Sequence, residues 1–254
     1  MISMPACDRL SLDLMRRHLA AEIVGRHVYL LGTVDSTTAV LRRLAERGAV
    51  EGTVVFAEEQ TAAADAAFRS SPDAITLELS VLFRPEIAPG DVRLFAAVGA
   101  LALTDAIGAE GAAADVRWPS DVVIGERVVG AVTVDDATAG DRVQHVILGF
   151  RVNVDVAGAG ADRNVFAARL LNLLEKWREI FVTRGRAAVL AAWQARDGLR
   201  GRRLQIRTGT AVWQGRGRGI DPSGCLIVED SGGRPRRVTD GEVRILDIGS
   251  EEDV

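Results

Sequence analysis

The chain has 254 residues, enough for one large domain or for a large domain followed by a small one. Hydrophobic residues make up 48% of it and aromatic residues only 5%, which predicts a core built mainly of Val, Leu, Ile and Ala. The formal net charge of −4, from 31 basic and 35 acidic residues, argues against general binding to nucleic acid.

The composition also argues against a zinc site and a membrane span. Cys7 and Cys225 lie far apart and the three histidines are scattered, so no group has the spacing of zinc ligands. No apolar run approaches the roughly 18 residues of a membrane helix, and the first residues lack the pattern of a signal peptide. We therefore expect a soluble, cytoplasmic protein without zinc.

Hydrophobic periodicity predicts a mixture of helices and strands up to residue 198. The predicted helices are 10–23, 38–47, 93–106, 164–183 and 187–195, and the predicted strands are 27–32, 53–57, 75–83, 122–124, 128–134 and 143–154. Ser36 is suited to cap the helix at 38–47, and Gly48 is suited to end it.

The pattern changes near Asp197-Gly198. Beyond it, short predicted strands at 204–208, 210–218, 225–229, 235–238 and 243–246 are separated by turns, which is typical of a small β-barrel. Residues 199–254 contain ten arginines and nine acidic residues, so this part is nearly neutral. We expect two domains, 1–198 and 199–254, and no nucleic-acid site in the second.

The most informative segment is Arg117-Trp118-Pro119-Ser120-Asp121, followed by Gly125-Glu126-Arg127-Val128-Val129-Gly130. Pro119 interrupts any helix, and the residues after it read as two strands around a Gly-Glu turn. Arg117 and Arg127 would both lie at strand ends, an arrangement that suits a pocket for an anionic ligand.

This segment resembles the Lys-Trp-Pro-Asn-Asp … Lys-x-x-Gly signature of biotin protein ligases. Three more segments of the chain match motifs of that family and occur in the family's order. Residues 35–38 resemble its Ser-Thr-Asn motif, residues 51–61 resemble its strand leading to Gln-Thr, and residues 149–155 resemble its Gly-x-Gly-x-Asn-Val-Asn strand. The resemblance runs from about Leu30 to Leu246.

The resemblance implies an α+β fold with a mixed or antiparallel sheet, of the class II aminoacyl-tRNA-synthetase-like biotin/lipoate ligase type, and an SH3-like C-terminal β-barrel. It also implies a reaction of biotin with ATP and Mg²⁺ that gives biotinyl-AMP. The biotinyl group then passes to a lysine of a biotin carboxyl carrier domain. Because the family often pairs sheets edge to edge, a homodimer is left open.

The resemblance assigns site residues position by position. Arg127 and Arg117 stand where the family has lysines that face the biotin carboxylate and the phosphates, and Asp121 stands where it has an acid near ATP and Mg²⁺. The implied biotin contacts are Ser36, Thr37, Gln60, Gly130, Val132 and Gly149, and the implied ATP contacts are Trp118, Ser120, Asn153 and Arg69. Simpler roles stay open: Ser36 as a helix cap, Trp118 in the core, Arg117 and Arg127 in surface ion pairs, and Asn153 as a turn-forming residue at a strand end.

Two departures from the family affect the expected chemistry. After Gln60-Thr61 the family has a Gly-Arg-Gly-Arg-Arg-Gly-x-x-Trp loop, whereas residues 62–72 here read AAADAAFRSSP, with Arg69 the sole cation and Asp65 an added acid. Within this segment, residues 62–67 suit a short helix or a plain connection. In addition, Arg151 stands where the family has glycine, and a long side chain there would enter the ligand's space unless it pointed away.

Adenylation brings two anions together, so fixed cations must offset their repulsion. With most of the arginine cluster missing, we expect biotinyl-adenylate synthesis to be weak or absent. The alternative is a non-catalytic ligase-fold module that binds a small carboxylate ligand or a carrier domain. An acyl ligase for lipoate or octanoate is less favoured because of the C-terminal barrel.

Overall fold

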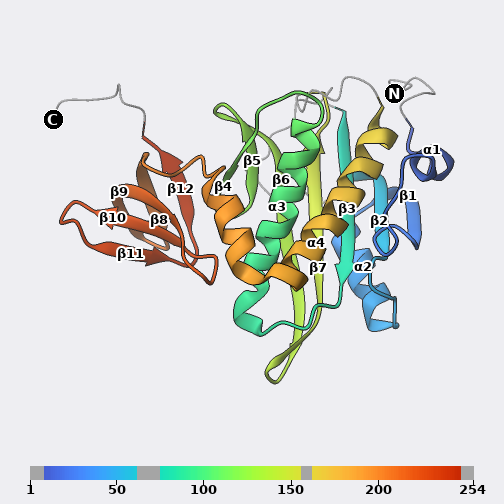
Figure 1. Cartoon of the computed structure of the whole chain (residues 1–254), viewed down its shortest axis with the longest axis horizontal. Coiled ribbons are helices and arrows are strands. Elements are labelled where there is room, and N and C mark those ends of the chain that lie inside the picture. The colour runs from blue at the N-terminus through green and yellow to red at the C-terminus, as the bar shows by residue number, and fades with distance from the viewer. Residues whose placement is uncertain (1–8, 62–74, 156–161, 247–254) are drawn as a thin grey trace.

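The computed structural model describes residues 9–61, 75–155 and 162–246. The predicted short helix or connection at 62–67, together with Asp65 and Arg69, lies outside these residues. Two sheets organise the rest of the chain (Figure 1).

The larger sheet has seven strands in the order β1-β2-β3-β7-β6-β5-β4. The strands are β1 (Val28–Val34), β2 (Val54–Gln60), β3 (Thr76–Phe83), β4 (Asp115–Arg117), β5 (Asp121–Ile124), β6 (Arg127–Ala139) and β7 (Arg142–Asn153). β1 and β2 are parallel, and every other neighbouring pair is antiparallel. The predicted α+β class with a mixed sheet is therefore confirmed.

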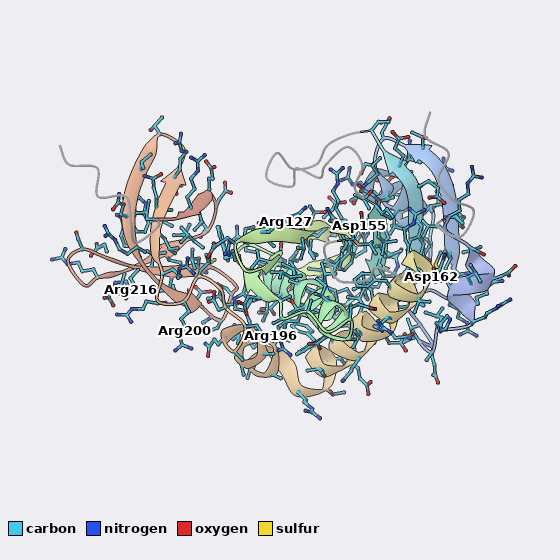
Figure 2. The ribbon with its side chains drawn as sticks, turned by 90° about the horizontal axis from the view of Figure 1, so that it is seen from above. Arg127, Asp155, Asp162, Arg196, Arg200 and Arg216 are labelled. Carbon is cyan, nitrogen blue, oxygen red and sulfur yellow. The ribbon has the colours of Figure 1, made fainter. Side chains whose placement is uncertain are left out.

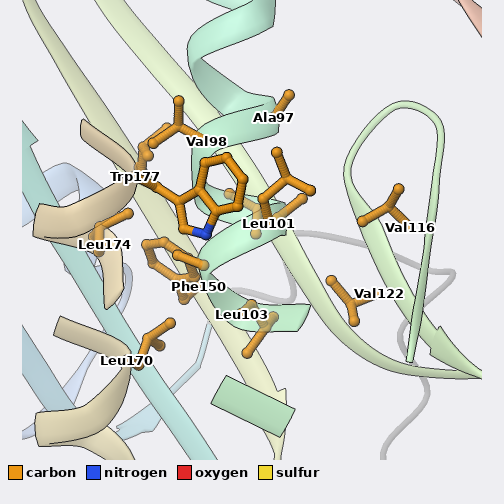
Figure 3. Close-up of a cluster of buried hydrophobic side chains, with 14 of the residues drawn as sticks. Ala97, Val98, Leu101, Leu103, Val116, Val122, Phe150, Leu170, Leu174 and Trp177 are labelled. Atoms are coloured by element: carbon orange, nitrogen blue, oxygen red, sulfur yellow. The ribbon is translucent and has the colours of Figure 1, made fainter. Parts of the chain in front are cut away.

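Helices cover both faces of this sheet. α3 (Val92–Gly108) and α4 (Arg163–Gln194) pack on one face, while α2 (Thr37–Glu46) packs against β2, β3 and β7 on the other. β3 shows the division: Phe83 belongs to the core beneath α3 and α4, whereas the adjacent Leu82 packs with Leu41 of α2. Figure 3 shows the first core, where Trp177 of α4 lies among Val98, Leu101 and Phe150.

The predicted helix at 10–23 was too long, because α1 covers only Leu12–Arg16. The backbone N–H groups of residues 20–24 are bound by side chains of α4 instead of by helical carbonyls. Asn172 accepts from the amides of residues 20 and 21, and Glu175 accepts from those of residues 22–24. A periodic apolar pattern cannot reveal such a distant set of acceptors.

The two helices predicted at 164–183 and 187–195 lie in one element, α4, which is kinked at Gly185. Gly185 has φ of 71° and ψ of −174°, a conformation that favours glycine and breaks the helical path. The boundary between the two predicted helices was therefore correctly placed. A short 3₁₀ helix (Pro89–Asp91) precedes α3.

The C-terminal sheet has five antiparallel strands in the order β11-β10-β9-β8-β12. The strands are β8 (Arg203–Thr208), β9 (Ala211–Ile220), β10 (Leu226–Asp230), β11 (Pro235–Val238) and β12 (Glu242–Ile245), each within a few residues of its predicted position. The domain boundary at 198/199 stays a prediction. Across the described residues, none of the helices has the length and apolar character needed to cross a bilayer.

Candidate functional site

A cluster of polar side chains lies where the start of α2 meets β2 and β3. Gln60 Oε1 accepts from the Thr37 backbone N–H at 2.6 Å and from Thr37 Oγ1 at 3.1 Å. The Ser80 hydroxyl lies 2.8 Å from Thr37 Oγ1 and 2.9 Å from Thr38 Oγ1. The structure thus brings Thr37 and Gln60, two of the predicted biotin contacts, into direct hydrogen bonding.

Ser36 lies beside this cluster and caps α2. Its Oγ accepts from the Ala39 backbone N–H at 3.3 Å, as an N-cap residue does. The predicted capping role is confirmed. A contact of Ser36 with a ligand stays a prediction.

Gly149 of β7 is also part of this face, since it pairs with Ser80 of β3 and with Thr133 of β6. A Cβ atom there would lie 2.6 Å from Thr133 Oγ1 and 2.8 Å from Thr38 Oγ1. Glycine is therefore needed so that these hydroxyls can lie close to the β7 backbone.

For the biotin site that the resemblance implies, replacing Gly149 with alanine is expected to weaken binding about tenfold and to destabilise the fold by about 1–3 kcal/mol, because the added methyl group overpacks the hydroxyl cluster. Isothermal titration calorimetry and urea unfolding measure the two effects. Gly32→Ala of β1 is the matched control, because its Cβ would have no neighbour within 4 Å. Unchanged binding in Gly149→Ala would place the ligand elsewhere.

Gly130 and Val132 of β6 do not share that face. A Cβ at Gly130 would lie 2.5 Å from Leu103 Cδ2 of α3, and Val132 Cγ1 lies 2.9 Å from the Cβ position of Gly99, also in α3. Their side-chain positions thus point into the core beneath α3, away from Thr37 and Gln60. The prediction that they wall a ligand pocket can hold only for their backbone, and it stays a prediction.

Arg151 of β7 reaches a buried carboxylate on β3. Its Nε lies 2.9 Å from Glu78 Oε1, and Glu78 is only 2% exposed. Glu78 Oε2 also accepts from Gln60 Nε2. Arg151 therefore points toward the predicted biotin contacts, and its charge is neutralised by Glu78 within that face.

Burial raises the pKa of Glu78 above its ordinary value, while Arg151 and the hydrogen bond from Gln60 act in the opposite direction. Glu78 and Ser80 were missed as site residues. The signal was available, because they are polar side chains at alternate positions of an otherwise apolar strand, TLELSVLF.

Arg117 forms the ion pair that the sequence left open. Its Nη2 lies 2.6 Å from Glu126 Oε2 and donates to the Gly125 carbonyl at 3.0 Å. Arg202 of the C-terminal part also reaches Glu126, at 2.9 Å. Hydrogen bonds from Arg202 and Arg117 lower the pKa of Glu126. The two cations thereby hold the turn that leads to Arg127.

Arg127 opens β6 and is exposed. Within the described ranges its side chain forms no hydrogen bond or ion pair, so its charge is not offset by a protein carboxylate there. In the view from above, Arg127 and Asp155 lie on the side of the sheet away from α4 (Figure 2). That placement suits a cation that binds an incoming anion.

Asp121 and Asn153 lie on the strands around Arg151. Asp121 pairs with Ala131, which in turn pairs with Arg151, so all three side chains share one face of the antiparallel sheet. Asn153, two residues beyond Arg151, is 4% exposed. Among the described residues no group of three or more His, Cys, Asp or Glu is placed to hold a metal ion. One carboxylate with phosphate oxygens is nevertheless a ligand set that Mg²⁺ accepts, and Asp121 fits it.

Trp118 and Ser120 are held by the protein itself. Trp118 is 6% exposed, and its Nε1 donates to the Gly224 carbonyl of the C-terminal part at 3.0 Å. Ser120 Oγ donates to the Val132 carbonyl at 2.5 Å. For Trp118 the structure therefore favours the packing role over a wall of the nucleotide site.

Known proteins are similar to this chain in sequence and in fold. Residues 31–153 match the model of the biotin/lipoate A/B protein ligase family. A biotin–[acetyl-CoA-carboxylase] ligase from Paracoccus denitrificans is 31% identical over 229 residues, which cover 81% of this chain and 95% of that protein. A bifunctional ligase/repressor BirA from Bacillus spizizenii is 29% identical over 248 residues, which cover 89% and 76% respectively.

Among solved structures, biotin protein ligase from Aquifex aeolicus in complex with biotin and ATP superposes with a TM-score of 0.70. That match covers 87% of this chain and 99% of the other at 18% identity, so it shows the shared fold alone. The sequence matches go further, and this chain belongs to the biotin/lipoate protein ligase family, among relatives that are biotin ligases.

Proposed function

We propose that this protein binds biotin and ATP, joins them slowly to biotinyl-AMP, and transfers the biotinyl group to a lysine of the carrier domain of a carboxylase. The observation that carries the proposal is the polar cluster of Thr37, Gln60 and Ser80 beside Gly149. A ring with a urea group needs such hydrogen-bonding partners when it is buried.

The charged residues suit the step in which the biotin carboxylate meets the phosphates of ATP. Arg127 offers an exposed cation for a carboxylate and the α-phosphate, and arginine binds such groups with a planar fork. Asp121, with phosphate oxygens, would hold Mg²⁺, which supplies further positive charge to the phosphates when bound. Asn153 and Ser120 stay predicted ATP contacts, and a homodimer stays a prediction.

The slow rate follows from the composition of residues 62–72. Removing a single preorganised donor typically lowers a rate by about 10²–10³. This segment has one arginine and one acid where the family has three arginines, so we expect at least that loss in adenylate formation relative to an intact loop.

Two measurements test the function. Calorimetry with biotin is expected to show binding, and pyrophosphate release from ATP is expected to be slow. Replacing residues 62–70 with the family's Gly-Arg-Gly-Arg-Arg-Gly-x-x-Trp sequence should then raise adenylate formation by about 10² or more. Ordinary ligase turnover in the unaltered protein would refute the slow rate, and absence of biotin binding would refute the proposed substrate.

The second candidate is a non-catalytic module that binds a small carboxylate or a carrier domain. The Arg151–Glu78 pair favours it, because this pair fills a position that glycine leaves open in the family motif. A pull-down with a carrier domain, together with complete absence of pyrophosphate release after the loop replacement, would support this candidate over the first.

A further inference from the structure

One continuous series of polar contacts connects three strands of the large sheet with helix α2. It begins at Arg151 of β7, passes through Glu78 of β3 to Gln60 of β2, and continues through Thr37 of α2 to Ser80. At its centre lies the Gln60 carboxamide, the group that the proposed function assigns to ligand recognition.

The hydrogen-bonding capacity of Gln60 is largely used within the protein. A carboxamide oxygen has two acceptor sites, and both are taken by the backbone N–H and hydroxyl of Thr37. The amide nitrogen has two hydrogens, and Glu78 Oε2 takes one of them. With respect to the described residues, Gln60 therefore has one N–H donor left for a ligand and no acceptor.

Glu78 determines which way the carboxamide faces. The two ends of a glutamine amide are nearly the same in shape and differ only in hydrogen bonding. An ionised carboxylate accepts from Nε2 and repels Oε1, so it holds one of the two orientations. Among the described residues Arg151 is the charged group that faces Glu78, while Gln60 itself is neutral. Burial raises the pKa of this 2%-exposed carboxylate, and the ion pair with Arg151 acts against burial by favouring the charged form.

We propose that Glu78 and Arg151 are a positioning pair that fixes the Gln60 carboxamide as a donor, so that the site selects a carboxylic acid whose ring carries a hydrogen-bond acceptor. A cyclic urea has such an acceptor, and a dithiolane ring does not. The proposal rests on the proposed function for the ligand, but the fixed orientation of Gln60 can be measured without any ligand.

The ligand-free measurement uses NMR of the Gln60 side-chain amide. In the unaltered protein one of its two Nε2 protons is expected to exchange slowly with solvent, because Glu78 holds it. In Glu78→Leu this protection is expected to be lost. Glu59→Gln is the control, since Glu59 is an exposed acid on the same strand and its loss should leave the signals unchanged. Two rapidly exchanging protons in the unaltered protein would overturn the proposal.

The ligand measurement compares biotin with lipoate by calorimetry. Glu78→Leu is expected to weaken biotin binding at least tenfold and to change lipoate binding less than twofold. Glu78→Gln keeps an acceptor without the charge, so its expected loss of biotin affinity is two- to threefold. It also serves as the readout if the leucine variant does not fold.

The pH profile separates positioning from simple stability. In the unaltered protein biotin affinity should fall on acidification as Glu78 takes up a proton and the ion pair is lost. The fall in biotin affinity on acidification should be absent in Glu78→Gln and present in Glu59→Gln. Equal loss of biotin and lipoate binding in Glu78→Leu would overturn the selectivity. If NMR shows the protected Gln60 proton but calorimetry shows no biotin binding, the positioning role of Glu78 and Arg151 stands and the proposed substrate is refuted.

Discussion

Replacing Arg127 with glutamine is expected to lower biotinyl-adenylate formation at least a hundredfold and to leave the free energy of unfolding unchanged within about 0.5 kcal/mol. The side chain is exposed and has no hydrogen bond or ion pair within the described residues, so the fold loses nothing when the charge is removed. The reaction loses a fixed cation where two anions meet, which typically costs about 10²–10³ in rate.

The rate is best measured in a single turnover with radiolabelled biotin, because the unaltered protein is expected to be slow. Arg127→Lys keeps the positive charge and loses the planar guanidinium with its paired donors, so its rate should stay within about tenfold of that of the unaltered protein. Arg142→Gln, an exposed arginine at the start of β7, is the matched control for loss of one charge. A loss in Arg142→Gln equal to that in Arg127→Gln would show that only overall charge matters.

Local signals explain why much of the fold could be predicted from the sequence. Ser36 caps α2 because the N-cap bond involves only residues three apart, and Gly185 interrupts α4 through its own backbone freedom. The C-terminal strands were found because turns separate short alternating runs. In each case the information lies within a few residues of the feature.

The missed features depend on contacts between distant segments. The Arg151–Glu78 pair requires the register of β3 against β7, which no local pattern specifies. The packing of the Gly130 Cβ position against Leu103 of α3 is likewise a contact between distant segments, which a motif match does not specify. The predicted backbone contact of Gly130 with a ligand stays a prediction.

The same distinction between motif and packing applies to Trp118. Replacing it with alanine is expected to destabilise the protein by about 3–5 kcal/mol, because the change empties a buried site. It also removes the donor to the Gly224 carbonyl, so the contact between the large sheet and the C-terminal part is weakened as well. Urea unfolding followed by fluorescence and circular dichroism measures the loss.

Trp118→Phe separates packing from nucleotide binding, since it keeps most of the buried apolar area and removes only the donor. It should cost about 1–2 kcal/mol and leave the Kd for ATP within twofold. Trp213→Phe is the matched control: Trp213 is half-buried under Arg236, with 4.2 Å between the guanidinium carbon and the ring centroid. If Trp118→Phe instead weakened ATP binding more than tenfold at unchanged stability, the indole would belong to the nucleotide site, and its bond to Gly224 would be incidental.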